Sequence, residues 1–171
     1  MYTHPDIQGW MSNGELQWLY EAAQTRKRIV EIGCWKGRST HALLSGCNGT
    51  VFAVDHFRGN PSEIDGPHAE AKTVDIYEIF KRNTEQFNNL IVLRKDSVEA
   101  SKYFENDSLD LVFIDGEHTK EAFKADFETW LPKCSGIFCG HDAGMEGPNW
   151  YLNEFKINHI TREGIWILCR E

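Results

Sequence analysis

The sequence has no long uninterrupted run of apolar residues and no excess of basic charge. A membrane-spanning helix needs about 20 consecutive apolar residues, so we expect no membrane contact. Lys and Arg total 18 against 26 Asp and Glu, which gives a formal net charge of −8. A protein that binds nucleic acid by neutralising its phosphates needs the opposite balance, so we expect no nucleic-acid partner.

Signals for export and for disulfide bonding are also missing. The first ten residues, MYTHPDIQGW, have neither a basic start nor an apolar stretch, so they do not predict a secretory leader. The five cysteines form no C-x-x-C pair, and an odd number cannot all pair within one chain. We expect reduced thiols and a cytoplasmic location. Cys139 and Cys169 lie in apolar runs typical of buried strands.

The chain nevertheless has the material of a folded domain. Its 171 residues fit one domain at about 100–200 residues per domain, so we predict a single domain over 1–171. Hydrophobic residues make up 41% of the chain and aromatic residues 12%. This content is enough to build a core and excludes a disordered chain.

Apolar runs alternate with helical patterns along the chain. Strands are predicted at 28–33, 50–55, 90–95, 109–115, 136–140 and 164–170. Helices are predicted at 13–25, 39–46, 74–88, 98–104, 118–131 and 150–156, with a long loop over 56–73. This order predicts an α/β fold, a parallel sheet with helices on both faces. The carboxyl ends of the strands then meet at one edge, where ligands of such sheets bind.

The first candidate site is the segment EIGCWKGRS at 31–39, between a strand and a helix. Gly33 and Gly37 allow a tight turn and a close approach of the backbone to a ligand. Their G-x-x-x-G spacing differs from the G-x-G-x-x-G of dinucleotide binders, and a simple turn is the alternative. Asp55 ends the next strand, 22 residues after Gly33. A carboxylate there can accept hydrogen bonds from both hydroxyls of a ribose.

This combination resembles the class I S-adenosylmethionine-dependent methyltransferases. The stretches FIDGEH at 113–118 and GHD at 140–142 resemble in particular a small metal-associated group, which includes macrocin-type and rhamnosyl O-methyltransferases and cephalosporin hydroxylase-related proteins. The resemblance implies a three-layer Rossmann-like sandwich. Its seven-stranded sheet would be mostly parallel, with one antiparallel strand near the C-terminus.

The resemblance also implies which residues hold S-adenosylmethionine. They are Glu31, Gly33, Trp35, Gly37, Ser39, Asp55, His56, Asp96, Ser97 and Asp115. Residues of the glycine turn would surround the methionine part, Asp55 the ribose and His56 the adenine. Asp96 and Ser97 would lie near the adenine amino group, although both residue types also cap helices.

Acidic and imidazole side chains gather after two further strands. Asp115 ends one strand, His118 follows it, and His141 and Asp142 end the neighbouring strand. Carboxylates that converge on one point suit Mg²⁺ or Mn²⁺, so we expect a metal held by Asp115, His141 and Asp142. Asp115 and His118 are the expected catalytic residues, with His118 as general base. Capping of the neighbouring loops is the alternative for both aspartates, and His141 departs from the carboxylate expected in relatives.

The predicted function is transfer of a methyl group to a hydroxyl of a small molecule or sugar. The alternatives are a non-catalytic cofactor-binding module, a metal-dependent oxygenase built on His118, His141 and Asp142, and a nucleotide-dependent oxidoreductase. The loop over 56–73 is expected to act as a lid, since loops this long are often functional. Its expected contacts are Phe57, Arg58 and His68, and pairing into a homodimer is expected from relatives.

The aromatic residues fall into candidates for a pocket wall and candidates for the core. Trp10 and Trp35 are candidates for the wall of an acceptor pocket, with core packing as the alternative. Helical spacing predicts core positions for Tyr103, Phe123, Phe127 and Trp130.

Overall fold

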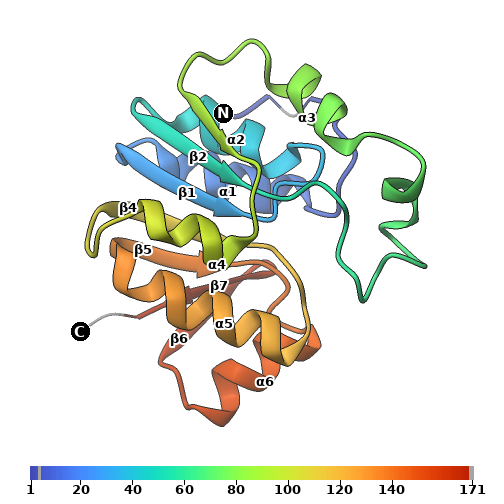
Figure 1. Ribbon diagram of the computed structural model, residues 1–171. Coiled ribbons are helices and arrows are strands. Elements are labelled where there is room, and N and C mark those ends of the chain that lie inside the picture. The colour runs from blue at the N-terminus through green and yellow to red at the C-terminus, as the bar shows by residue number, and fades with distance from the viewer. Residues whose placement is uncertain (4, 170–171) are drawn as a thin grey trace.

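The computed structural model describes residues 1–3 and 5–169, which fold around one seven-stranded sheet (Figure 1). The strands lie in the order β3-β2-β1-β4-β5-β7-β6. Their bounds are β1 Arg28–Ile32, β2 Thr50–Val54, β3 Leu90–Leu93, β4 Leu109–Ile114, β5 Cys134–Gly140, β6 His159–Arg162 and β7 Ile165–Leu168. The first five are parallel to one another, and β7 runs antiparallel to both β5 and β6. The predicted fold class is confirmed.

Helices cover both faces of the sheet (Figure 1). Their bounds are α1 Asn13–Ala23, α2 Arg38–Gly46, α3 Ile76–Thr84, α4 Ser97–Ala100, α5 Lys120–Trp130 and α6 Glu146–Glu154. Because side chains alternate along a strand, Val30 and Val112 pack in a core with α5 and α6, whereas Ile29 and Leu111 pack with α1 and α2. The strands are therefore apolar on both faces, as a doubly covered sheet requires.

Several helices begin at side chains that accept backbone N–H groups. Ser12 and Glu15 form a reciprocal capping box at α1. Asp75, Asp96 and Thr119 cap α3, α4 and α5. The cap at Asp96 shows that the capping alternative holds for this residue.

The structure corrects the predictions at three places. The short strand β6 was not predicted, because its residues are mostly exposed and show no apolar run. Helix α6 begins four residues before the predicted start, since Pro148 in its first turn costs no intrahelical bond. Tyr103 is 62% exposed and does not belong to the core, whereas Phe123, Phe127 and Trp130 are buried.

The long loop after β2 contains one short 3₁₀ helix, Ala69–Lys72. Two further 3₁₀ turns, Ser101–Tyr103 and Leu131–Lys133, follow α4 and α5. Within the described residues, every helix is too short or too polar to cross a membrane. Cys139 is buried and Cys169 is partly exposed, and the predicted end of the last strand at residue 170 lies outside the described residues.

Candidate functional site

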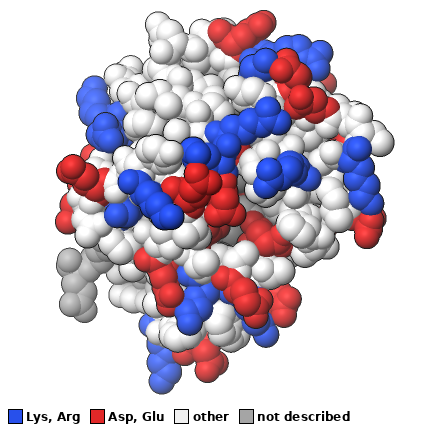
Figure 2. Space-filling model, in the orientation of Figure 1, with Lys and Arg blue, Asp and Glu red and all other residues white. Residues whose placement is uncertain are grey.

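A cavity of about 240 Å³ opens at the carboxyl edge of the sheet. Its lining comes from the N-terminal segment, the glycine turn, the loop after β2 and the segments that follow β4 and β5. We call it the main cavity. On the face drawn in Figure 2, acidic and basic side chains are interspersed, and acidic side chains gather near the centre. The predicted strand-end residues thus meet at one place, as the parallel topology requires.

The glycine turn between β1 and α2 depends on Gly33 and Gly37. Gly33 has a φ of +83°, and a Cβ atom there would lie 2.0 Å from the carbonyl oxygen of Asp115. Gly37 has a φ of +90° and precedes the first residue of α2. Glycine adopts positive φ values at little cost and has no Cβ atom. The turn can therefore bring the backbone after β1 directly against the end of β4.

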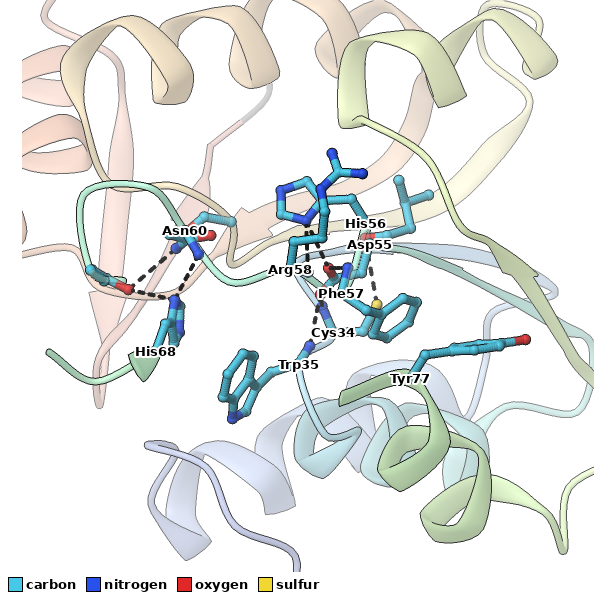
Figure 3. Close-up of polar contacts among 12 residues, drawn as sticks. Cys34, Trp35, Asp55, His56, Phe57, Arg58, Asn60, His68 and Tyr77 are labelled. Atoms are coloured by element: carbon cyan, nitrogen blue, oxygen red, sulfur yellow. Dashed lines mark hydrogen bonds and ion pairs between the residues drawn. The ribbon is translucent and has the colours of Figure 1, made fainter. Parts of the chain in front are cut away.

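The carboxylate of Asp55 holds this turn together (Figure 3). Its Oδ2 accepts the N–H groups of Cys34 and Trp35, each at 2.8 Å, and its Oδ1 accepts the N–H of Phe57 at 2.6 Å. Charge-assisted bonds of this kind are stronger than neutral ones. Asp55 is therefore a structural cap of the turn as well as a candidate ribose ligand.

Glu31 lies under the turn and is fully buried. The Thr40 hydroxyl donates to its Oε2, while its Oε1 has no hydrogen-bond partner among the described residues. Burial raises the pKa of Glu31 to about 7, against the lowering effect of the Ser39 and Thr40 hydroxyls. Ser39, in the first turn of α2, is also buried and lines the main cavity.

A second cavity, of about 220 Å³, lies beside the first and shares Gly33, Asp55 and Asn60 with it. Its lining includes His56, Asp96 and Ser97, three of the residues predicted near an adenine. We call it the second cavity. Because the two cavities share walls, eight of the ten predicted cofactor residues line a single path along the strand edge, and Glu31 and Gly37 line neither cavity.

The buried Asp126 of α5 also lines the second cavity, and sequence reasoning missed it. Burial raises its pKa to about 7, against a hydrogen bond from Ser97. Ser97 also accepts a hydrogen bond from Trp130 Nε1 at 2.8 Å. An acid in the middle of an amphipathic helix gives no sign in the sequence that it faces inward.

His118 lies between two carboxylates in the main cavity. Its Nδ1 donates to Glu63 Oε1 at 2.7 Å, and its Nε2 lies 2.9 Å from Asp142 Oδ2. Burial alone would lower the pKa of His118, but the hydrogen bonds to Asp142 and Glu63 raise it to about 9. In this arrangement the imidazole is protonated at neutral pH.

His141 is surrounded by three carboxylates. Its Nε2 lies 2.9 Å from Glu15 Oε1, and its Nδ1 lies 3.4 Å from Asp115 Oδ1 and 3.2 Å from Asp142 Oδ2. Burial alone would lower its pKa, but hydrogen bonds to Asp115 and Asp142 raise the pKa to about 11. Both ring nitrogens of His141 therefore face acids, whereas a metal ligand needs one free lone pair.

The predicted metal set stays a prediction, and the structure also brings His118 close to its two aspartates. Ligand atoms of Asp115, His118 and Asp142 all lie within 4.8 Å of one another. This group has one imidazole and two carboxylates, whereas the facial triad of iron oxygenases has two imidazoles and one carboxylate. The geometry therefore gives no support to the oxygenase alternative.

Sequence reasoning missed Glu15 and Glu63, the two acids that orient the histidines. Glu15 comes from α1 and pairs with a residue 126 positions away, and Glu63 pairs with one 55 positions away. In the sequence Glu15 has the form of a helix cap, a role that it also fills. Only the folded chain brings these acids to the imidazoles.

The aromatic side chains at the cavity mouth form one group. His68 stacks on Trp35 with 4.4 Å between ring centroids, and Trp10 lies 5.2 Å from His68. All three line the main cavity, where Trp10 and Trp35 were predicted as a pocket wall and His68 as a contact of the long loop. Phe57 and Arg58 are not among its lining residues: Phe57 is buried against α3 and Arg58 is exposed, so their role as lid contacts stays a prediction.

Comparison with known proteins places these features among methyltransferases. The model of a family described as a methyltransferase domain matches residues 30–143. The chain is 35% identical over 143 residues to the uncharacterized protein y4gI of Sinorhizobium fredii, which covers 78% of this chain. The chain spans only 15% of that relative's length.

Solved structures share the fold. The O-methyltransferase from Bacillus cereus, in complex with SAH, has a TM-score of 0.64 at 19% identity, over 98% of this chain and 84% of that one. CalS11, a TDP-rhamnose 3′-O-methyltransferase of calicheamicin biosynthesis, has a TM-score of 0.60 at 16% identity, over 90% and 76% of the two chains. At these identities the likeness is one of fold.

Proposed function

The chain belongs to the methyltransferase-domain family, and we propose that it transfers a methyl group from S-adenosylmethionine to a hydroxyl of a small molecule or sugar. The observation that carries this proposal is the arrangement of the strand edge. Two adjacent cavities there share Gly33 and Asp55, and His118 lies on the wall of the main cavity with two acids around it. A cofactor and an acceptor thus have separate places beside one acid–base group.

The residues present fit the cofactor. The unpaired Oε1 of Glu31 lies under the glycine turn, where a buried acceptor needs a donor such as the methionine ammonium group. Asp55, His56 and Asp96 would hold the adenosine in the second cavity, and the turn Gly33–Gly37 would approach the methionine part. When bound, S-adenosylmethionine supplies an electrophilic methyl carbon, whose bond to sulfur breaks as its bond to the acceptor oxygen forms.

The donor set also fits a divalent cation. Glu15, Glu63, Asp115 and Asp142 carry four negative charges when ionised, and protonated His118 and His141 carry two positive ones. The remaining charge of about −2 equals what one Mg²⁺ or Mn²⁺ would neutralise, and carboxylate oxygens are preferred by both ions. We propose Asp115 and Asp142 as the carboxylate ligands, with His118 outside the ligand set. His141, the third ligand predicted from the sequence, would join them only after losing its ring proton and one of its acid contacts. The ion would polarise an acceptor hydroxyl.

His118 is the proposed general base. A cation held by Asp115 and Asp142 would weaken their pairing with the imidazoles, and the pKa of His118 would then lie closer to its ordinary value. Its Nε2 can then accept the hydroxyl proton as the acceptor oxygen forms its new bond. The glycine turn and the aromatic group would align the two reactants, which lowers the entropic part of the barrier. The expected partners are a small acceptor and a second copy of the chain.

The decisive test of the proposal is calorimetry with S-adenosylhomocysteine and S-adenosylmethionine. We expect both to bind with micromolar dissociation constants, and Asp96→Ala to weaken binding about tenfold by removing a contact of the second cavity. Absence of binding of either ligand would refute the proposal. Normal binding, together with unchanged methyl transfer in His118→Ala, would instead favour a different base. Complete absence of transfer to any hydroxylated acceptor would favour a non-catalytic module.

A further inference from the structure

The loop over 59–73 is attached to the segment that follows β4. Asn60 Nδ2 donates to the carbonyl oxygen of Gly116 at 3.1 Å, and Ser62 Oγ donates to Glu117 Oε1. Glu63 Oε1 accepts the Nδ1 proton of His118 at 2.7 Å. Three loop residues thus contact three consecutive residues beside Asp115.

The same loop is attached to the glycine turn at its other end. His68 stacks on Trp35, and Glu70 forms an ion pair with Lys36, whose side chain is only 5% exposed. Gly59, where the loop begins, has a φ of +74°, and a Cβ there would lie 2.9 Å from His68 Cβ. The loop therefore spans the main cavity from one wall to the other.

Hydrogen bonding identifies the partner of Glu63. His68 Nδ1 also lies close to Glu63, at 3.1 Å from Oε2, but it accepts the N–H of Asn60 at 2.9 Å (Figure 3). A ring nitrogen that accepts a proton cannot also donate one. Within the described structure, His118 is therefore the imidazole that donates to Glu63. Asn60 Nδ2 lies 3.3 Å from Glu63 Oε2 and fixes the orientation of the carboxylate.

We propose that Glu63 is a positioning residue for His118, so that docking of the 59–73 loop sets the ring orientation and the proton position of the catalytic imidazole. A carboxylate on Nδ1 keeps the proton at that nitrogen and directs Nε2 toward Asp142, on the cavity wall. The inference rests on the proposed function, in which His118 acts on the acceptor. It adds that the base is complete only while the loop is docked.

The experiment is nuclear magnetic resonance of the ring nitrogens in protein labelled with ¹⁵N-histidine and saturated with S-adenosylhomocysteine. In the wild-type protein we expect the Nδ1 proton of His118 to give a downfield, slowly exchanging signal, assigned by its loss in His118→Gln. In Glu63→Gln the charge is removed while the size is kept, and we expect this signal to shift upfield and to exchange at least tenfold faster. Glu63→Asp should restore part of the protection.

Asp65→Asn is the matched control, because Asp65 lies on the same loop with its side chain 90% exposed and pairs only with the exposed Lys72. It should leave the His118 signal unchanged. An unchanged signal in Glu63→Gln, in a protein that still binds S-adenosylhomocysteine, would overturn the positioning role alone. If the wild-type protein binds no S-adenosylhomocysteine, the proposed function itself fails, so the two failures are distinguishable.

Discussion

Asp55 and Asp142 follow strands of the same sheet and face the same cavity, yet they are held in opposite ways. Asp55 accepts three backbone N–H groups, which carry no titratable proton. Asp142 lies against the imidazoles of His118 and His141. Burial alone would raise the pKa of Asp142, but its hydrogen bonds to the two histidines hold the pKa well below its usual range.

This difference divides the carboxyl edge of the sheet into two halves. In the fixed half, after β1 and β2, backbone N–H groups hold the carboxylate. In the exchangeable half, after β4 and β5, titratable side chains hold it. Backbone donors at Asp55 cannot change their charge or leave without unfolding of the turn. The imidazoles at Asp142 can lose a proton, rotate or give way to a cation. We therefore propose that the half formed by β1 and β2 binds the cofactor and that the half formed by β4 and β5 carries the acid–base chemistry.

The largest effect is expected where the two halves meet, at Gly33. In Gly33→Ala the new methyl group would lie 2.0 Å from the carbonyl oxygen of Asp115, at a φ that L-residues rarely adopt. We expect a loss of more than about 3 kcal/mol in the free energy of unfolding and no measurable S-adenosylhomocysteine binding. Urea unfolding and calorimetry measure both. Gly144→Ala is the control, since a Cβ there meets nothing within 4 Å, and equal stability of the two variants would contradict the prediction.

The fixed half is tested by Asp55→Ala. This change leaves three backbone N–H groups without their charged acceptor, and we expect a loss of about 3 kcal/mol in the free energy of unfolding. Asp96→Ala removes only a helix cap to Val98 and should cost about 1 kcal/mol. Chemical denaturation of both variants measures the two losses in the free energy of unfolding. A loss at Asp55 no larger than that at Asp96 would show that its carboxylate does not hold the turn.

The pH dependence of stability tests the buried acid below the turn. The folded-state pKa of Glu31 is raised from 4.5 to about 7, so its contribution is fully present below pH 4.5 and is lost as pH rises through 7. The loss amounts to about 3 kcal/mol. In Glu31→Gln this part of the pH dependence should disappear. Urea unfolding of both proteins at pH 5 and pH 8 measures it, and parallel stability curves would contradict the raised pKa.

The exchangeable half is tested by added Mn²⁺. If Asp142 is a ligand, millimolar Mn²⁺ should raise the melting temperature of the wild-type protein by a few degrees, as any ligand of the native state does. Asp142→Asn should lose most of this increase, while Asp55→Asn should keep it. Differential scanning calorimetry is the measurement. An equal response of both variants would place the cation elsewhere, and no response of the wild type would remove it from the proposal.

The smallest effect is expected at Tyr103, outside both halves. Tyr103 is 62% exposed, and Lys95 Nζ lies 5.7 Å from the centroid of its ring. Tyr103→Ser should change the free energy of unfolding by less than about 1 kcal/mol. Trp130→Ala, at a fully buried position at the end of α5, should cost about 3 kcal/mol or more. Thermal unfolding of both variants checks the contrast.

Hydrophobic pattern and turn chemistry predicted much of this molecule. The alternation of buried strands and amphipathic helices predicted the layers, and the glycines at 33 and 37 predicted the tight turn after the first strand. The strand β6 escaped prediction because an exposed edge strand needs no apolar run. Tyr103 was predicted wrongly because helical spacing cannot show that a helix ends one turn early, here at Ala100.

The sequence by itself determined which polar residues reach the strand edge, since topology sends every strand end of a parallel sheet to the same side. Only the tertiary structure decided their partners. In the folded chain His118 lies against Glu63 and Asp142, and His141 lies against Glu15. Asp55 accepts hydrogen bonds from backbone N–H groups. The physical reason is that strand and helix formation follow from local periodicity, whereas the charge of an imidazole or a carboxylate depends on groups that distant segments bring within about 3 Å.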